Sequence, residues 1–426
     1  MKTIIGVCLV LFIAWPASAA NYLLNGGQES NINYKMTQKI EPTPNIRKLI
    51  LTYVVPATFD SPTYSQNIET VDFSFVPPPT KREEVTDARG NHVITVTWLP
   101  PLKPITSTIA LKAKNTVKLK TLTSNASFPV TDIPEPVKAY LAATEQVASN
   151  DPAIMEMAKT LTRSAKTEFD AVQKIMAWVV DHMHYVLTPK SYDSMYSFET
   201  GKGNCQNYSH LAAALMRAVG IPVRIVNGIT MKKPYDVTMG EYIITMKLAE
   251  GRHSWIEIYF PDLGWVPSDA QGSQMFISNR FLRVEVGLDN NETEQDGLVS
   301  WSRRKGSTDA PEFSESIDAK FETDTVDMKG KEMTYGPRES LFTPAIEAAF
   351  TEVVVEPPPP PPPVIPEIEL KQLVYSDPFR FGNLEFPENV DFLTTRGPAQ
   401  EAPDGTMKAK KNFLVETAEY VTTKGQ

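Results

Sequence analysis

The stretch that decides the fold, GKGNCQNYSHLAAALMRAVGIP, runs from Gly201 to Pro222 and predicts a helix with sharply defined ends. Asn204 is a preferred N-cap residue, so Cys205 falls on the first helical position. Gly220 suits the left-handed conformation that often ends a helix, and the proline two residues later prevents continuation. Between these ends an apolar stripe recurs every four residues and is expected to pack inward: Leu211, Leu215 and Val219.

The position of Cys205 at a helix start has a chemical consequence. Unsatisfied backbone N–H groups and the helix dipole favour negative charge there, which stabilises a thiolate over a thiol. The same N–H groups could hold the oxyanion that forms when a sulfur attacks a carbonyl. A free cysteine is, however, also a common small core residue. The helix position alone leaves both interpretations open.

The first twenty residues, MKTIIGVCLVLFIAWPASAA, predict a signal peptide. Lys2 precedes an apolar run, and Ala17, Ser18 and Ala19 fit a signal-peptidase site. The run is too short to favour a transmembrane anchor, with an uncleaved N-terminal anchor as the alternative. We therefore expect an exported protein, periplasmic or secreted, with no stable membrane span after cleavage.

The number of cysteines and the net charge limit the classes of function that the protein could have. The chain has 2 cysteines, and Cys8 lies in the predicted signal peptide, so Cys205 would be the single thiol of the mature protein. A lone thiol in an oxidising compartment is a liability unless it is buried or used. The formal net charge of −9 argues against a general nucleic-acid-binding protein, because that role needs basic surface. It is compatible with a peptide or small-molecule substrate.

The chain divides into five expected parts. Residues 1–20 are the signal peptide, and residues 21–130 carry short alternating Val-, Ile- and Thr-rich runs that predict an antiparallel β-sandwich domain. Residues 131–350, with predicted helices at 131–149 and 167–183 followed by strands, form an α+β core domain. Residues 351–366 are a proline-rich linker and residues 367–426 a small or poorly ordered tail. The linker is a stiff spacer or, alternatively, a docking site for a proline-motif partner.

A second informative stretch, GRHSWIEIYFPDLGWVPSDAQG, runs from Gly251 to Gly272. Strand alternation puts His253 on a face with polar and aromatic neighbours, and a turn at PDLG returns the chain as a second strand that ends at Asp269. The hairpin is expected to bring Asp269 near His253. A carboxylate in that place fixes the imidazole tautomer, and the imidazole in turn activates a thiol.

The other histidines compete poorly for the role of base. His210 lies five residues after Cys205 on the same helix and therefore points away from the sulfur. His182 and His184 form an H-x-H pair, but no neighbouring ligand completes a metal set. We expect no metal and no cofactor.

Together the two stretches resemble the transglutaminase-like superfamily. The resemblance covers roughly residues 165–275 and rests on the G-x-C helix, the G-I-P-x-R strand, the H-x-W-x-E strand and the G-W…D strand. It implies a papain-like α+β fold, with the nucleophile helix packed on an antiparallel sheet. It also implies that Cys205, His253 and Asp269 are nucleophile, base and orienting carboxylate. One departure is that Ala and Gln follow the aspartate, where many members have Pro-Thr or similar.

The implied chemistry is attack of a thiol on an amide carbonyl of a protein or peptide, through a thioester. Water as acceptor makes a protease or deamidase, and an amine makes a transamidase; the sequence leaves both open. Alternatives are a catalytically idle peptide-binding or envelope-assembly module on the same fold, or a structural envelope protein in which the spacer matters most.

Supporting roles can be assigned to several nearby residues. Tyr185, Tyr192 and Gln206 are candidate oxyanion donors, and none is favoured over the others. Trp255 is the candidate for substrate contact, with core packing as the alternative. Arg224 is expected in a structural ion pair and Glu257 as a solvated strand carboxylate.

Overall fold

The computed structural model describes residues 21–333, except 121, 240, 241, 247, 249 and 273–275, together with the short segments 346–348, 399–401, 407–409 and 421–424. The predicted signal peptide and proline-rich linker, and most of the predicted tail, lie outside the described residues and stay predictions. Within the described part, no helix has the length and apolar character needed to cross a bilayer.

The helical segments are α1 (Glu135–Lys138), η1 (Ala139–Leu141), α2 (Pro152–Thr162), α3 (Glu168–His182), α4 (Ser194–Thr200), α5 (Cys205–Ala218) and η2 (Ala270–Gly272). The strands before α5 are β1 (Asn21–Glu41), β2 (Ile46–Val55), β3 (Phe59–Asp60), β4 (Tyr64–Val76), β5 (Lys81–Thr86), β6 (His92–Trp98), β7 (Ile105–Leu119), β8 (Leu122–Ser124), β9 (His184–Tyr185) and β10 (Lys202–Gly203). Those after it are β11 (Val223–Thr230), β12 (Tyr235–Met239), β13 (Tyr242–Met246), β14 (Gly251–Phe260), β15 (Gly264–Ser268), β16 (Phe281–Gly287), β17 (Leu298–Arg303), β18 (Glu312–Met333), β19 (Ile346–Ala348), β20 (Ala399–Glu401), β21 (Met407–Ala409) and β22 (Val421–Lys424).

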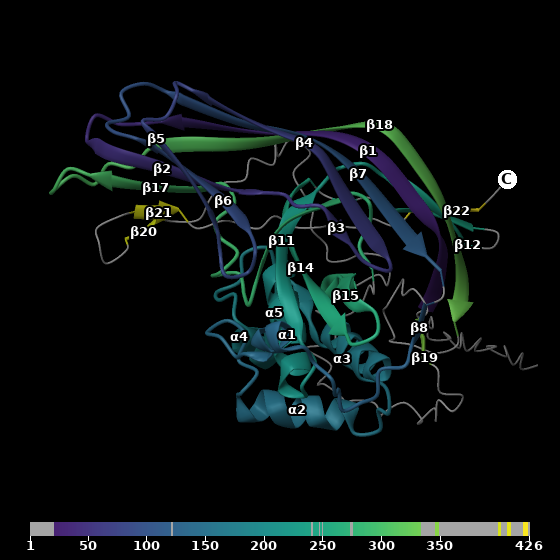
Figure 1. Cartoon of the computed structure of the whole chain (residues 1–426). Coiled ribbons are helices and arrows are strands. Elements are labelled where there is room, and N and C mark those ends of the chain that lie inside the picture. Colours follow the sequence, from purple (N-terminus) through teal and green to yellow (C-terminus); the bar gives the residue numbers. More distant parts are fainter. Residues whose placement is uncertain are drawn as a thin grey trace, which may run out of the picture.

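The fold is α+β, as the sequence predicts, and its strand-rich part is built from two large sheets (Figure 1). One has the order β22-β13-β12-β18-β1-β7-β4-β3, and the other β20-β21-β17-β2-β6-β5. Apolar side chains from both sheets share one buried cluster, to which β1 contributes Ile32 and Met36 and β2 contributes Leu49 and Leu51. Two sheets that share a core in this way form a sandwich.

Strands from late in the chain complete these sheets. β18 pairs with β1 from Asn21↔Met333 to Glu41↔Glu312, and β17 pairs with β2. The expected division of the chain at residue 130 stays a prediction, but residues 298–333 pair with the N-terminal strands. The helical region is therefore an insertion between strands of shared sheets.

The core below the sandwich is a four-stranded sheet with the order β15-β14-β11-β16, covered by α5 with α2 and α3 behind it (Figure 1). Ile256, Ile258 and Phe260 alternate along β14 and share a buried cluster with Leu211 and Leu215 of α5. The predicted inward stripe of the helix and the predicted apolar face of the strand therefore pack on each other, as a nucleophile-helix-on-sheet arrangement requires.

The helix predicted over residues 131–149 forms only from Glu135 to Leu141 and is wrong on either side of that segment. Ala142 is extended (φ −64°, ψ 137°), and only α1 and the single turn of η1 form. A true helix, α2, begins after it, because Asp151 caps the N–H groups of Ala153 and Ile154 and Pro152 occupies the first turn. The Asp-Pro pair at residues 151–152 is the sequence signal that a helix begins there.

Candidate active site

The start of α5 is held by a reciprocal cap around Cys205. The Asn204 side chain accepts a hydrogen bond from Gln206 N (3.1 Å), and the Asn207 side chain accepts one from Asn204 N (3.1 Å). Asn207 also donates to Ser197 Oγ of α4 (2.9 Å), which ties the cap to the neighbouring helix. Cys205 is therefore the first residue of a rigidly capped helix, and its side chain is 0% exposed.

His253 and Asp269 meet as expected from the hairpin. His253 Nε2 lies 3.0 Å from Asp269 Oδ2, and both side chains are buried. The other carboxylate oxygen, Oδ1, accepts a hydrogen bond from Gln271 N (2.9 Å), which fixes its orientation. An ionised carboxylate accepts at both atoms, so Nε2 is the imidazole nitrogen that carries a proton.

Two contacts bring α5 to the strand that carries His253 and to the turn that follows Asp269. Ser209 Oγ donates to the backbone oxygen of Ser254, the residue after His253, at 3.1 Å. Cys205 and Ser209 are four positions apart and so share one face of the helix. The turn η2, which directly follows Asp269, also packs on α5. The helix start, the histidine strand and the aspartate turn thus converge on one junction.

Tyr192 lies within electrostatic reach of Cys205. Burial raises the pKa of its phenol, and the negative charge of a thiolate at Cys205 raises that pKa further. Of the other two candidate oxyanion donors, Gln206 is buried beside the cap and Tyr185 is half-buried in β9. No donor is distinguished among the three, and the role stays a prediction.

Trp255 is fully buried rather than presented to a cleft. Its ring packs edge-on against Phe281 (5.2 Å between centroids), and His253 stacks beside it at 5.9 Å. This is the core-packing alternative, and it does not support the predicted substrate contact. The close packing instead helps to hold the imidazole in place.

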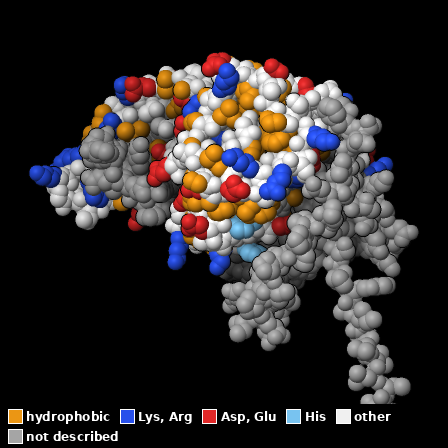
Figure 2. All heavy atoms as spheres, turned by 90° about the horizontal axis from the view of Figure 1, so that it is seen from below, with side chains coloured by type: hydrophobic (Ala, Val, Ile, Leu, Met, Phe, Trp, Pro, Cys, Tyr) orange, Lys and Arg blue, Asp and Glu red, His pale blue; other side chains and the backbone are white. Residues whose placement is uncertain are grey.

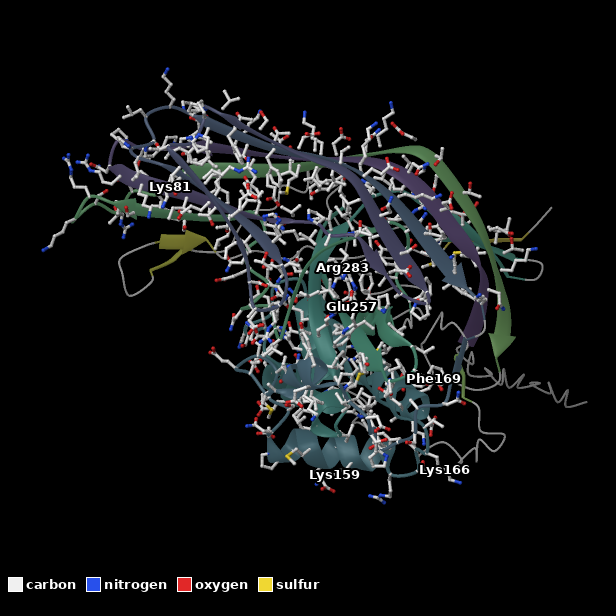
Figure 3. All side chains as sticks on the ribbon, viewed as in Figure 1. Lys81, Lys159, Lys166, Phe169, Glu257 and Arg283 are labelled. Atoms are coloured by element: carbon white, nitrogen blue, oxygen red, sulfur yellow. The ribbon has the colours of Figure 1, made fainter. Side chains whose placement is uncertain are left out.

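The expectation of a solvated carboxylate at Glu257 is wrong. Its side chain is 0% exposed and forms ion pairs with Arg224 (2.5 Å) and Arg283 (2.7 Å), in the region labelled in Figure 3. Burial alone would raise the pKa of Glu257, but the two guanidinium groups outweigh it and hold the pKa below its ordinary value. The ion pair predicted for Arg224 is confirmed.

Sequence reasoning missed a second buried charge cluster, around Arg252. Its guanidinium lies 2.6 Å from Asp296 Oδ2 and 2.9 Å from Glu315 Oε2, and all three side chains are buried. Arg252 directly precedes His253, whereas Glu315 belongs to β18. The only sequence signal was a charged residue on the apolar face of a strand.

His210 has a structural role on the same helix. Its Nδ1 donates to the backbone oxygen of Tyr192 (2.6 Å), and its Nε2 accepts from Asn290 N (3.2 Å). Burial lowers the pKa of His210 to about 4, so the ring is neutral near pH 7. Among the described residues, no three His, Cys, Asp or Glu side chains are grouped as metal ligands.

A family model described as the transglutaminase-like superfamily matches residues 155–270, which include Cys205, His253 and Asp269. Residues 155–270 are a transglutaminase-like domain. The transglutaminase-like domain occupies a minority of the chain, and the sandwich strands flank it on both sides.

Two curated relatives, both described as uncharacterised, match parts of the chain. YebA of Bacillus subtilis is 31% identical over 121 residues, which is 26% of this chain and 16% of the relative. ML0607 of Mycobacterium leprae is 34% identical over 89 residues, which is 21% of this chain and 28% of the relative. The chain thus spans less than a third of the length of either relative.

Two solved structures are similar at low identity. A proposed cysteine protease from Cytophaga hutchinsonii has a TM-score of 0.49 and 15% identity, covering 74% of this chain and 95% of that one. The periplasmic domain of TgpA from Pseudomonas aeruginosa, bound to ethylmercury, has a TM-score of 0.28 and 12% identity, covering 56% and 89%. Similarities at this level do not transfer an activity.

Proposed function

We propose that the protein is an exported thiol enzyme that attacks amide carbonyls of proteins or peptides. Cys205 is the nucleophile, His253 the base and Asp269 the carboxylate that orients the base. The observation that carries the proposal is the buried hydrogen bond between His253 Nε2 and Asp269 Oδ2, on a strand that Ser209 ties to the Cys205 helix. The match of the transglutaminase-like domain to the same residues supports it.

In this mechanism His253 removes the thiol proton through Nδ1, because Nε2 is engaged by Asp269. The sulfur bonds to the carbonyl carbon, and the oxygen takes the negative charge. The backbone N–H of Cys205, with a side-chain donor among Tyr185, Tyr192 and Gln206, holds that oxyanion. Collapse breaks the C–N bond, the imidazolium gives its proton to the leaving amine, and a thioester remains on Cys205.

A second nucleophile resolves the thioester. Water gives a carboxylate, so the reaction is hydrolysis or deamidation, and an amine gives a new amide. In both cases His253 takes a proton from the attacking group and returns it to the departing sulfur. The enzyme needs no cofactor for these steps.

The catalytically idle alternative, a peptide-binding or envelope-assembly module, is favoured by one observation. The side chains of Cys205 and His253 are both 0% exposed, whereas a working nucleophile must meet its substrate. Export rests on the N-terminal sequence, and a proline-motif partner rests on the seven consecutive prolines of the linker. Both belong to this proposal.

The experiment is trapping of the acyl-enzyme. The purified chain is incubated with glutamine-containing peptides, with and without a primary amine, and analysed by intact-protein and peptide mass spectrometry. We expect an adduct on Cys205 that is absent from Cys205→Ala and strongly reduced in His253→Ala.

The matched control is His184→Ala, because His184 is an exposed histidine of the same domain. It should form the adduct at the wild-type rate. Equal adduct formation in His253→Ala and wild type would remove His253 from the mechanism. No adduct in any of the proteins, while peptide still binds, would favour the idle module. The ratio of hydrolysed to amine-coupled peptide then identifies the acceptor.

A further inference from the structure

One end of the β-sandwich gathers four loops from distant parts of the chain. Strand register places them together: Ile40 pairs with Ile105, and Arg303 pairs with Ile46. Lys81 pairs with Thr97 in the same way. We call residues 41–48, 76–84, 99–104 and 303–312 the loop end; it lies at the left of Figure 1, where β17 ends and β5 begins.

The loop end exposes large apolar side chains. Leu102 is 83% exposed, Val76 62% and Leu99 51%, and these are three of the five large hydrophobic residues that stand out as exposed in the described part of the chain. Nine prolines lie in the same four segments. Because proline fixes its backbone φ, the apolar side chains are presented on preorganised loops. Clustered exposed apolar groups of this kind mark an interaction site.

The loop end is also basic in an acidic protein. Its four segments hold eight Lys and Arg against five Asp and Glu, a net charge of +3 (8 minus 5), which leaves −12 (−9 minus +3) for the rest of the chain. Two cations, Lys81 and Arg82, are neutralised by Glu83 and Glu84. The excess positive charge therefore comes from the other three loops: Arg47, Lys48, Lys103, Arg303, Arg304 and Lys305.

Figure 2 shows Lys and Arg side chains at the extreme of this end. In Figure 3 Lys81 marks the loop end, whereas Lys159 and Lys166 mark the helical side of the molecule, far from it. The apolar and basic groups thus share one extremity, at one end of the sandwich and away from α2 and α3.

We propose that the loop end docks on an anionic phospholipid surface. Leucine and valine side chains enter the boundary between headgroups and acyl chains, while the surrounding cations face lipid phosphates. The acidic remainder of the chain is repelled by the same surface, so the molecule is oriented with the loop end against the membrane. In that orientation the transglutaminase-like domain is held away from the membrane. The proposal does not depend on the activity of Cys205.

The test uses the chain from residue 21 onward, the mature form expected from the sequence, so that the apolar first twenty residues do not contribute. Co-sedimentation is measured with vesicles of phosphatidylglycerol and phosphatidylethanolamine and with vesicles of phosphatidylcholine alone. We expect binding to the anionic vesicles only, weakening as salt rises from about 0.05 M to about 0.5 M. Arg304→Glu/Lys305→Glu and Leu99→Asp/Leu102→Asp should each lower the partition coefficient roughly ten-fold or more.

The matched control is Lys159→Glu/Lys166→Glu, which makes the same charge change on the helical side and should bind as wild type does. Equal binding to both vesicle types, or an equal loss in the control, overturns the proposal. Light scattering tests whether a second copy of the chain occupies the loop end instead. If the protein self-associates, does not bind vesicles, and loses its self-association in Leu99→Asp/Leu102→Asp, the loop end is an interface between copies. Cys205→Ala should bind vesicles normally, which separates this test from that of the catalytic proposal.

Discussion

Arg252 and Glu315 are 63 positions apart in the chain and form a fully buried ion pair, with 2.9 Å between Nη2 and Oε2. The pair joins β14, one residue before His253, to the long strand β18 of the sandwich. The position of the histidine strand is therefore set by the sandwich as well as by the sheet of the transglutaminase-like domain.

Replacing Arg252 by Met should destabilise the protein by about 3–5 kcal/mol, because Glu315 and Asp296 would be left buried without a cation. The measurement is urea denaturation of both proteins. Arg82→Met is the control, since the exposed pair between Arg82 and Glu84 is worth at most about 1 kcal/mol. If the two variants lose equal stability, the buried pair is not the link described above.

Replacing Asp269 by Asn should lower the rate of Cys205 acylation by about 10²–10⁴-fold, because an amide cannot stabilise the imidazolium of His253. The rate is read from the adduct assay at several pH values. Folding should be almost unchanged, since Asn has the same shape and Oδ1 can still accept from Gln271 N. A variant that acylates at the wild-type rate would remove Asp269 from the mechanism.

Glu168 should make stability pH-dependent. Burial, and then the negative charge of Asp262, raise the pKa of Glu168 from its ordinary value of 4.5 to about 9. Between pH 4.5 and pH 9 the folded state binds more protons than the unfolded state. The contribution of Glu168 to the free energy of unfolding is therefore fully present below pH 4.5 and is lost as pH rises toward 9. The slope is at most about 1.4 kcal/mol per pH unit.

The measurement is the denaturation midpoint at pH 5, 7 and 9. Glu168→Gln has no titrating proton at this position, so its stability relative to wild type should increase steadily as pH rises. The exposed Glu156→Gln is the control and should follow wild type. A constant difference between Glu168→Gln and wild type at all three pH values would show that Glu168 does not hold a proton in the fold.

Gly203 lies against the cap of the nucleophile helix, where a Cβ would be 2.2 Å from Asn207 Cβ. Gly203→Ala should therefore displace Asn207, destabilise the protein by about 1–3 kcal/mol and slow acylation of Cys205. Denaturation and the adduct assay measure the two effects. Removal of the neighbouring Cβ in Gly203→Ala/Asn207→Gly should cost less than the sum of the single variants. Additive costs would mean that the two side chains do not compete for space.

Local features of the site were predictable because they depend on neighbours in sequence. Asn204 caps α5, and Gly220 adopts the left-handed conformation (φ 82°) at its end. The hairpin turn between β14 and β15 brings Asp269 to His253 across only 16 positions. Short loops leave few ways to pair two strands, so alternation and turn chemistry sufficed.

Burial of charge was not predictable in the same way. Period-2 alternation predicts which β14 residues share a face with Glu257. It does not predict that Arg283 of β16 and residues of the sandwich cover that face. The failed helix over residues 131–149 had good helix-forming composition, but Ala142 is extended and its backbone oxygen accepts a hydrogen bond from Arg217, 75 positions away.

By itself, the sequence determined the capped cysteine helix, the histidine strand, the aspartate turn and the family they resemble, because each depends on residues a few positions apart. Only the tertiary structure decided that β18 returns to pair with β1, that Arg252 meets Glu315, and that four distant loops form one basic, apolar end. Those features depend on contacts between segments up to about three hundred residues apart, which no local pattern encodes.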